Sequence, residues 1–208
     1  MLQTQTVQPD TFSVLKRLMG IPALENFYLV GRTALSLIYG HRISEDLDLF
    51  TNGSLEVEEI KSSLTNAFGT SFKVRSQGIG FGLFCFVNEA KIDLVRTPHP
   101  KIRKTYEMDG IRFISTEDII AMKVQAVLGR ARKKDFWDIA ELLQHYSVDD
   151  FARFHREKFS QQNLMVTVPQ AISYFADAEE DADPKSLKGQ TWESVKATIR
   201  DKVRNYLA

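Results

Sequence analysis

The sequence predicts a mixed α/β fold in its first half and an all-helical region in its second half. Hydrophobic residues make up 43% of the 208 residues, which is enough apolar surface for a packed core. Short apolar runs with a period of two, typical of strands, recur up to about residue 114. From Ser115 onward the apolar spacing becomes helical. We therefore expect two regions, residues 1–115 and 116–208, which this length can supply.

The composition limits the class of protein. Lys plus Arg and Asp plus Glu both number 27, and a neutral chain does not predict nucleic-acid binding over its whole surface, although local basic patches stay possible. The single cysteine, Cys85, excludes an intramolecular disulfide and a Cys-rich metal site, and it is expected to be buried in a strand. No secretory signal is visible at the N-terminus. No apolar run reaches the ~18 residues of a membrane span, so we expect a cytoplasmic protein without a membrane partner.

The first half can be assigned element by element. A short amphipathic helix is expected around 11–19 and a buried strand at 27–30. Gly31 ends that strand, and a helix over 33–39 follows, with Gly40 as its stop. The remaining elements expected in this half are strands at 46–50, 72–76, 81–87, 91–95 and 111–114 and a helix at 54–68.

The second half is expected to consist of five helices, at 117–130, 134–146, 148–159, 169–178 and 192–206. Ser115 and Asp118 have the spacing of a capping box. Pro169 suits a first helical position, and Thr191 is a reasonable N-cap. The acidic segment 179–183 is predicted to be an exposed linker.

Two carboxylates on one expected strand, Asp46 and Asp48, are the main chemical feature. Side chains two residues apart on a strand point to the same face. Carboxylates placed side by side repel each other and resist the loss of water. A divalent metal is the commonest reason for this placement, because hard cations such as Mg²⁺ bind carboxylate oxygens. A solvated edge strand or loop is the alternative. A calcium-binding EF-hand is excluded, because Thr51 and Val57 stand where it requires Gly and Glu.

A third carboxylate, Asp93, lies on the expected strand at 91–95. If this strand lies beside the strand at 46–50, the three carboxylates can converge. Two metal ions about 4 Å apart need such a cluster of anionic oxygens. Taken alone, Asp93 would be an ordinary solvated or hydrogen-bonded carboxylate.

The turn Gly31–Thr33 joins an expected strand to an expected helix. At such a turn, backbone N–H groups and the helix dipole can bind phosphate, and the Thr33 hydroxyl would be a further donor. Glycine at a strand–helix turn is also often only a backbone requirement. The turn by itself therefore leaves both interpretations open.

Three charged residues of the second half are candidates for the same chemistry. Lys123 lies on or next to the apolar stripe of its helix. Its ammonium either extends to solvent at the rim of that stripe or is directed at a triphosphate or at the carboxylates. Asp135 and Asp138 share one face of the next helix and can pair with Lys123 or with the basic run 130–134. Structural ion pairs are the simpler interpretation of these two acids.

Taken together, these motifs resemble the nucleotidyltransferase family that includes the AbiEii/AbiGii abortive-infection toxins. The segment Tyr28–Phe50, YLVGRTALSLIYGHRISEDLDLF, is similar to the family pattern of a Gly-rich turn, Thr-Ala-Leu, His-Arg-x-Ser and Asp-Leu-Asp-Leu-Phe. The later motifs at Lys91–Asp93, Met122–Lys123 and Lys134–Asp138 follow in the expected order. The resemblance spans about residues 27–143.

The resemblance implies a core like that of DNA polymerase β: a mixed sheet flanked by helices, followed by a helical C-terminal part. It implies Asp46 and Asp48 as ligands of Mg²⁺ (or Mn²⁺) and Asp93 as the third carboxylate, near the attacking hydroxyl. The residues it implies for nucleotide binding are Gly31, Arg32, Thr33, Lys123, Asp135 and Asp138. The family usually has Gly or Ser where this chain has Arg32, which either blocks the phosphate or contacts the triphosphate.

The implied partners are a nucleoside triphosphate, an acceptor and an antitoxin protein, with RNA such as tRNA among the family's acceptors. A basic stripe on the last helix, formed by Lys196, Arg200 and Arg204, fits either a polyanion or solvent. The predicted function is a metal-dependent nucleotidyltransferase that acts as a toxin on RNA or protein. The alternatives are a degenerate member that binds nucleotide or antitoxin without turnover, and a structural α/β protein without a ligand.

Overall fold

The computed structural model describes all residues from 1 to 208 and divides into two compact units. The sheet unit comprises Met1–Ile38, Ser44–Pro100 and Lys104–Ile114. The helical unit comprises Tyr39–Ile43, Lys101–Arg103 and Ser115–Ala208. None of the helices has both the length and the apolar composition that crossing a bilayer requires.

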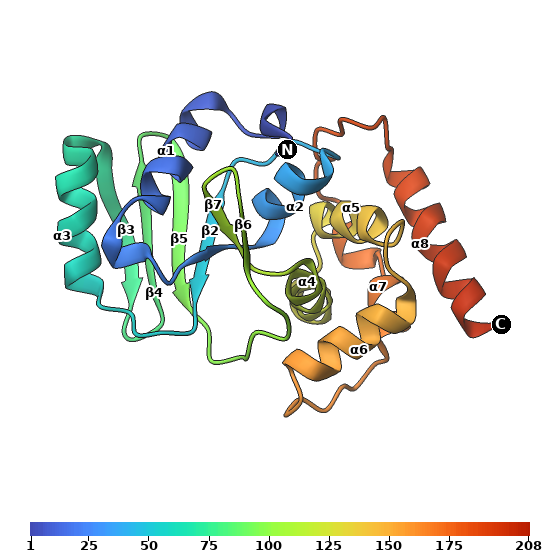
Figure 1. Cartoon of the computed structure of the whole chain (residues 1–208). Helices are drawn as coiled ribbons and strands as arrows, with labels where there is room; N and C mark the ends of the chain where they lie inside the picture. The colour runs from blue at the N-terminus through green and yellow to red at the C-terminus, as the bar shows by residue number, and fades with distance from the viewer. The chain divides into compact units, whose positions relative to one another are not determined.

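The sheet unit is built on one seven-stranded mixed sheet with the order β3-β4-β5-β2-β1-β7-β6 (Figure 1). The strands are β1 (Tyr28–Leu29), β2 (Leu47–Thr51), β3 (Phe72–Gly78), β4 (Gly82–Val87), β5 (Ala90–Arg96), β6 (Tyr106–Met108) and β7 (Ile111–Phe113). Its helices are α1 (Pro9–Met19), α2 (Gly31–Tyr39) and α3 (Val57–Phe68), with 3-10 turns at Thr4–Thr6, Pro22–Leu24 and Gly69–Ser71. The pairs β2–β5 and β1–β7 are parallel, and the other neighbours are antiparallel.

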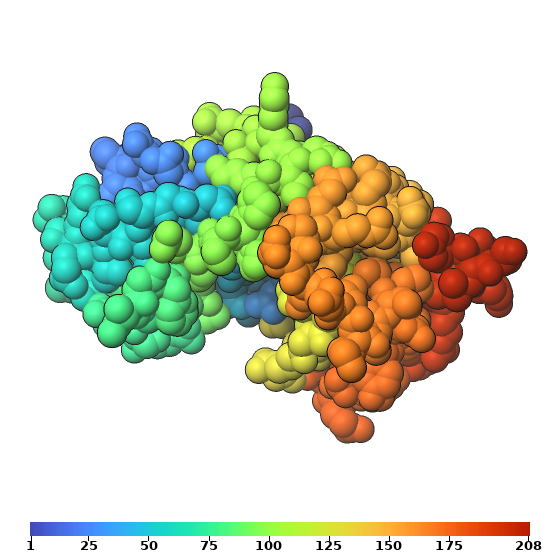
Figure 2. All heavy atoms as spheres, turned by 90° about the horizontal axis from the view of Figure 1, so that it is seen from below, coloured from blue at the N-terminus to red at the C-terminus, as the bar shows by residue number.

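Along the central strands, buried apolar residues alternate with partly buried polar residues. On β2 and β5 the leucines and isoleucine are fully buried, while the intervening acidic positions are only partly buried. The helices α1 and α3 contact the sheet, and α3 lies beside β3 and β4 on the surface seen in Figure 2. Cys85 is buried in β4 as expected, and burial raises the pKa of its thiol to about 12. One side of each central strand thus supplies the core and leaves the other for polar chemistry.

Most of the expected elements of this half are present, and the differences include the following. The helix expected at 54–68 begins only at Val57, and Asp46 precedes β2 instead of belonging to it. The strand β6 was not anticipated. It pairs with β7 through a turn at Asp109 and Gly110, both with positive φ, which is the backbone of a two-residue hairpin that favours Asp-Gly.

The helical unit contains α4 (Thr116–Arg130), α5 (Lys133–Leu142), α6 (Val148–Lys158), α7 (Val168–Ile172) and α8 (Trp192–Leu207), with a 3-10 turn at Ala176–Ala178. The Ser115 hydroxyl caps α4 by accepting from the backbone N–H of Asp118, as predicted. Thr191 is the N-cap of α8, also as predicted. The single helix expected at 169–178 is wrong, because α7 ends at Ile172.

The acidic segment 179–183 is mostly exposed, as predicted, and it is anchored to other parts of the helical unit. Glu179 accepts hydrogen bonds from Trp192 Nε1 and from Lys196 Nζ. Asp181 binds the Arg132 side chain at 2.7 Å and the backbone N–H of Lys133 at 3.0 Å. The segment therefore ties the start of α5 to α8.

The basic stripe predicted on α8 is partly paired with acidic residues of the protein itself. Lys196 is buried and pairs with Glu179 and Glu193. Arg204 pairs with Asp201, and Arg200 lies over the Phe175 ring. Because its ammonium is already paired with two glutamates, Lys196 is poorly placed to bind a polyanion.

Candidate active site

Two of the predicted carboxylates lie side by side on neighbouring strands of the sheet unit. In the parallel register of β2 and β5, Asp48 is paired directly with Asp93. Residues aligned in this way project from the same face of a sheet. Asp46 lies two residues before Asp48, at the entrance to β2. The sheet therefore brings Asp48 and Asp93 to one face, as the sequence predicted.

The three carboxylates differ in their partners. Asp46 Oδ2 pairs with Arg32 Nη2 at 2.7 Å. Asp93 pairs with Arg75 at 3.3 Å and with Lys91 at 3.1 Å.

The Asp48 side chain makes no hydrogen bond and no ion pair. In this structure no three His, Cys, Asp or Glu side chains are arranged to hold a metal ion. Asp46 and Asp93 are instead paired with cations of the chain itself, and a metal site formed by all three carboxylates stays a prediction.

Asp48 is in an environment that disfavours its ionised form. Burial raises the pKa of its carboxyl above the ordinary value. The Arg32 guanidinium opposes that rise, while the charges of Asp93 and Asp46 add to it. A proton or an added cation would relieve this energetic cost. Asp48 is thus the least compensated of the three carboxylates.

Gly31 brings backbone close to this carboxylate. It is the first residue of α2 and has a φ of +67°. A Cβ built at Gly31 would lie 3.0 Å from Asp48 Oδ2. The positive φ and the close approach both require glycine. The glycine turn and the carboxylate face are therefore adjacent.

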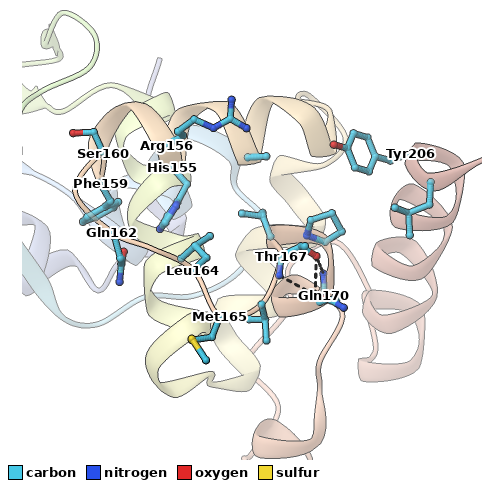
Figure 3. Close-up of a pocket in the computed structure, with 15 residues that line it drawn as sticks. His155, Arg156, Phe159, Ser160, Gln162, Leu164, Met165, Thr167, Gln170 and Tyr206 are labelled. Atoms are coloured by element: carbon cyan, nitrogen blue, oxygen red, sulfur yellow. Dashed lines mark hydrogen bonds between the residues drawn. The ribbon is translucent and has the colours of Figure 1, made fainter.

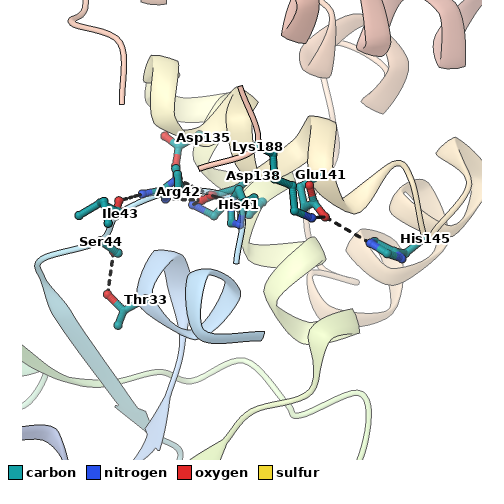
Figure 4. Close-up of polar contacts among 11 residues, drawn as sticks. Thr33, His41, Arg42, Ile43, Ser44, Asp135, Asp138, Glu141, His145 and Lys188 are labelled. Carbon is teal, nitrogen blue, oxygen red and sulfur yellow. Dashed lines mark hydrogen bonds and ion pairs between the residues drawn. The ribbon is translucent and has the colours of Figure 1, made fainter. Parts of the chain in front are cut away.

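The loop before β2 is held by buried hydroxyls (Figure 4). Thr33 is fully buried; its Oγ1 lies 2.8 Å from Ser44 Oγ and also donates to the backbone carbonyl of Asp46. The backbone N–H of Ser44 donates to the carbonyl of Thr6. These contacts set the position of Asp46. A phosphate contact by Thr33 stays a prediction, since its hydroxyl is used inside the protein here.

The donor set fits a divalent cation. Asp48 offers an unpartnered carboxylate, and Asp93 offers two more oxygens directly beside it. A site made of carboxylate oxygens without nitrogen or sulfur donors suits Mg²⁺ or Mn²⁺. Asp46 could bring the oxygen held by Arg32, Oδ2, to this site only by leaving Arg32. These carboxylates therefore fit a divalent metal, provided that the arginine and lysine side chains now paired with them move away.

In the helical unit, Lys123 is buried between two carboxylates. Its Nζ lies 2.8 Å from Asp135 Oδ1 and 2.6 Å from Asp138 Oδ2. Asp138 is fully buried and also accepts from His41 Nε2 at 2.8 Å and from Arg42 Nε and Nη2 at 2.8 and 2.9 Å. Figure 4 shows Arg42 and His41 directed at Asp138.

Asp138 has the opposite electrostatic balance to Asp48. Burial by itself would raise the pKa of Asp138, but Arg42, Lys123 and His41 outweigh it and hold that pKa well below the usual range. The buried ion pairs around Lys123 are contacts within the protein, which agrees with the simpler interpretation of Asp135 and Asp138 as structural ion-pair partners. Nucleotide contact by Lys123, Asp135 and Asp138 stays a prediction. Sequence reasoning missed His41 as a partner of Asp138, because 97 residues separate the two in the chain.

Nearly the whole chain matches one family of known proteins. Residues 13–205 match the family described as "Nucleotidyl transferase AbiEii toxin, Type IV TA system". The chain belongs to this family. The AbiEii assignment covers both units, from α1 to α8.

Related proteins agree with the AbiEii assignment. An uncharacterised protein of Aquifex aeolicus is 28% identical over 211 residues, which cover 93% of this chain and 94% of that protein. A Helicobacter pylori structure described as a candidate nucleotidyltransferase has a TM-score of 0.63 at 18% identity, covering 97% of this chain and 94% of the other. The MenT4 nucleotidyltransferase toxin of Mycobacterium tuberculosis has a TM-score of 0.59 at 11% identity, covering 93% and 81%. The two structures show that this AbiEii chain has the nucleotidyltransferase fold.

The helical unit of this AbiEii chain contains a cavity of about 560 Å³ whose lining differs from the carboxylate site (Figure 3). It is lined by apolar residues such as Phe159 and Met165 and by a few polar ones such as His155 and Thr167. No Asp or Glu lines it, and none of the predicted site residues does. Its lining cannot supply the carboxylates that a divalent cation requires.

Proposed function

We propose that this chain is a metal-dependent nucleotidyltransferase that transfers a nucleotide from a nucleoside triphosphate to an acceptor. The observation that carries the proposal is the unpartnered Asp48 carboxylate, aligned with Asp93 and placed against the Gly31 turn. Burial and acidic neighbours disfavour the ionised form of this carboxylate, and an added cation would offset that cost. Membership of the AbiEii family supports the same reaction class.

In this proposal, Asp48 and Asp93, joined by Asp46, hold Mg²⁺ or Mn²⁺. When bound, the metal offsets the charge of the triphosphate and lowers the pKa of the attacking hydroxyl. The acceptor oxygen forms a bond to the α-phosphorus, the bond to the bridging oxygen breaks, and pyrophosphate and a proton are released. Backbone N–H groups at the start of α2 bind phosphate oxygens, which places the α-phosphorus near the carboxylates. Asp93 orients the acceptor hydroxyl.

We further propose that the protein acts in the cytoplasm as the toxin of a toxin–antitoxin pair, with RNA, such as tRNA, or protein as the acceptor. The description of the family as a toxin of a type IV toxin–antitoxin system supports this role. MenT4, whose fold this chain shares, is named a nucleotidyltransferase toxin.

The reaction can be tested with labelled nucleoside triphosphates, Mg²⁺ and total RNA or protein. We expect label transfer by the wild type and a loss of at least about 100-fold in Asp48→Asn and Asp93→Asn, by analogy with removing a single charge-stabilising group. Asp10→Asn is the matched control, because Asp10 is an exposed acid on α1. Transfer that survives in Asp48→Asn would rule out the assigned site.

The alternative function is a member of the same fold that binds nucleotide or antitoxin without turnover. The ion pair between Arg32 and Asp46 favours it, because this pair uses a carboxylate that the reaction needs. Nucleotide binding without transfer from any of the four triphosphates, over many acceptors, would support this alternative over the enzyme.

A further inference from the structure

Arg32 occupies one of the two carboxylate oxygens of Asp46. It lies on the first turn of α2, one residue after Gly31, and its guanidinium pairs with Asp46 at 2.7 Å. Both side chains are partly exposed, at 21% for Arg32 and 27% for Asp46. The pair lies where the glycine turn and the carboxylate face meet. One arginine is thus within reach of both halves of the proposed site.

An arginine side chain is a permanent cation, and a carboxylate that loses such a partner is left uncompensated. Release of Asp46 therefore requires another cation to take its place. A partly exposed ion pair is screened by solvent and gains little from its Coulomb attraction. The pair is consequently one that a divalent ion can displace.

A displaced Arg32 would need a new anionic partner. The guanidinium presents several N–H donors in a planar fork, and this fork matches phosphate as well as carboxylate. The backbone of Arg32 belongs to the helix start that is expected to meet the triphosphate. The Arg32 guanidinium can therefore bind the Asp46 carboxylate first and triphosphate oxygens afterwards.

We propose that Arg32 is an exchangeable counter-cation that couples metal binding to triphosphate binding. Without metal it neutralises Asp46. When a divalent ion takes Asp46, the guanidinium is released and binds triphosphate oxygens. The inference rests on the proposed function, since it uses the same metal site. It adds that metal and nucleotide bind cooperatively and that Arg32 carries the coupling.

The test measures binding, without any turnover. Mn²⁺ affinity is measured from the free Mn²⁺ signal in electron paramagnetic resonance, for the wild type and for Arg32→Ser. We expect Arg32→Ser to bind Mn²⁺ about 3- to 5-fold more tightly, the change that one partly exposed ion pair supplies. Arg153→Ser is the matched control, because Arg153 also pairs with an aspartate, Asp150 on α6. Its Mn²⁺ affinity should equal that of the wild type.

The second measurement is the affinity for a non-hydrolysable nucleoside triphosphate with Mn²⁺ present. We expect Arg32→Ser to bind it about 10-fold more weakly, as for loss of one charge-assisted hydrogen bond. Arg32→Lys keeps the charge and loses the fork, so its Mn²⁺ affinity should stay near that of the wild type while its nucleotide affinity falls. Thermal unfolding of each variant checks that the fold is retained.

The outcomes separate this inference from the proposed function. If wild-type Mn²⁺ binding is lost in Asp48→Asn but is unchanged in Arg32→Ser, the metal site stands and the coupling role of Arg32 is overturned. Tighter Mn²⁺ binding with unchanged nucleotide affinity also overturns the coupling. If neither the wild type nor Arg32→Ser binds Mn²⁺, the proposed function fails together with the inference.

Discussion

Asp48 in the sheet unit and Asp138 in the helical unit carry the same side chain in opposite electrostatic surroundings. Asp138 is fully buried and is surrounded by Arg42, Lys123 and His41. Asp48 has no hydrogen-bonded or ion-paired partner and has two acidic neighbours. As a result the pKa of Asp138 is lowered and that of Asp48 is raised.

The difference shows how a carboxylate used for structure can be told from one available to a ligand. A buried carboxylate is tolerated when cations and hydrogen bonds replace the water that it has lost. Asp138 meets that condition within its own unit, so it needs nothing from outside. Asp48 does not meet it, and a proton or an external cation would complete its surroundings. Asp138 is in direct contact with its cations, whereas Arg32 and Lys91 act on the partly buried Asp48 without forming an ion pair with it.

The largest expected effect is on stability when Asp138 is removed. Asp138→Ala should lower the free energy of unfolding by about 3–5 kcal/mol, because Arg42 and Lys123 lose their shared buried partner. Chemical denaturation at pH 7 measures this. Asp149→Ala is the control, since Asp149 is exposed on α6 and should change stability by no more than about 0.5 kcal/mol. A loss below about 1 kcal/mol in Asp138→Ala would contradict the structural role.

The next effect is expected at the glycine turn. Gly31→Ala forces an alanine into a positive φ and places its Cβ 3.0 Å from Asp48 Oδ2. We expect a loss of roughly 1–3 kcal/mol of unfolding free energy. Gly189→Ala is the matched control, because Gly189 has a φ of +70° and a Cβ added there would meet nothing within 4 Å. The difference between the two variants measures the crowding at Asp48, and equal losses would show that there is none.

Replacing Asp48 should have a smaller effect of opposite sign. Because the folded-state pKa of Asp48 is raised, its ionised form costs stability once the pH rises through that pKa. Asp48→Asn should therefore unfold at a higher temperature than the wild type at pH 7. The gain should disappear below the unfolded pKa of about 4.

Asp138 should respond to pH in the opposite direction. Its folded-state pKa is lowered, so its contribution is present above about pH 4 and is lost as the pH falls through the folded pKa. Thermal unfolding of Asp48→Asn and Asp138→Ala across pH 3–7 checks both signs. Parallel pH profiles for the two variants would show that the proposed contrast between the carboxylates is wrong.

The smallest effect is expected on α8. Arg204 pairs with Asp201 at the surface, and both side chains are mostly exposed. Arg204→Ala should change the free energy of unfolding by less than about 0.5 kcal/mol, because solvent screens such pairs. Chemical denaturation checks this. A loss as large as that of Asp138→Ala would mean that burial does not distinguish the two pairs.

Local patterns in the sequence were sufficient for much of the fold. The period-two alternation around Asp48 and Asp93 placed both residues on strands with the leucines on the buried side. The caps Ser115 and Thr191 were predicted from single residues, because a cap satisfies backbone donors only two or three residues away. The strand β6 was missed, although Asp109 and Gly110 are a hairpin signal in the sequence.

The sequence by itself determined the chemistry available to this protein: a glycine turn, an Asp-x-Asp pair at the start of a strand and a third carboxylate in a second strand. These follow from local spacing, which the backbone geometry converts directly into facing side chains. Only the tertiary structure decided which cation meets which carboxylate. Arg32 reaches Asp46 and Arg75 reaches Asp93 because of the way the sheet unit folds. Asp138 acquires Arg42 and His41 across nearly a hundred residues, a pairing that depends on packing and has no local signal.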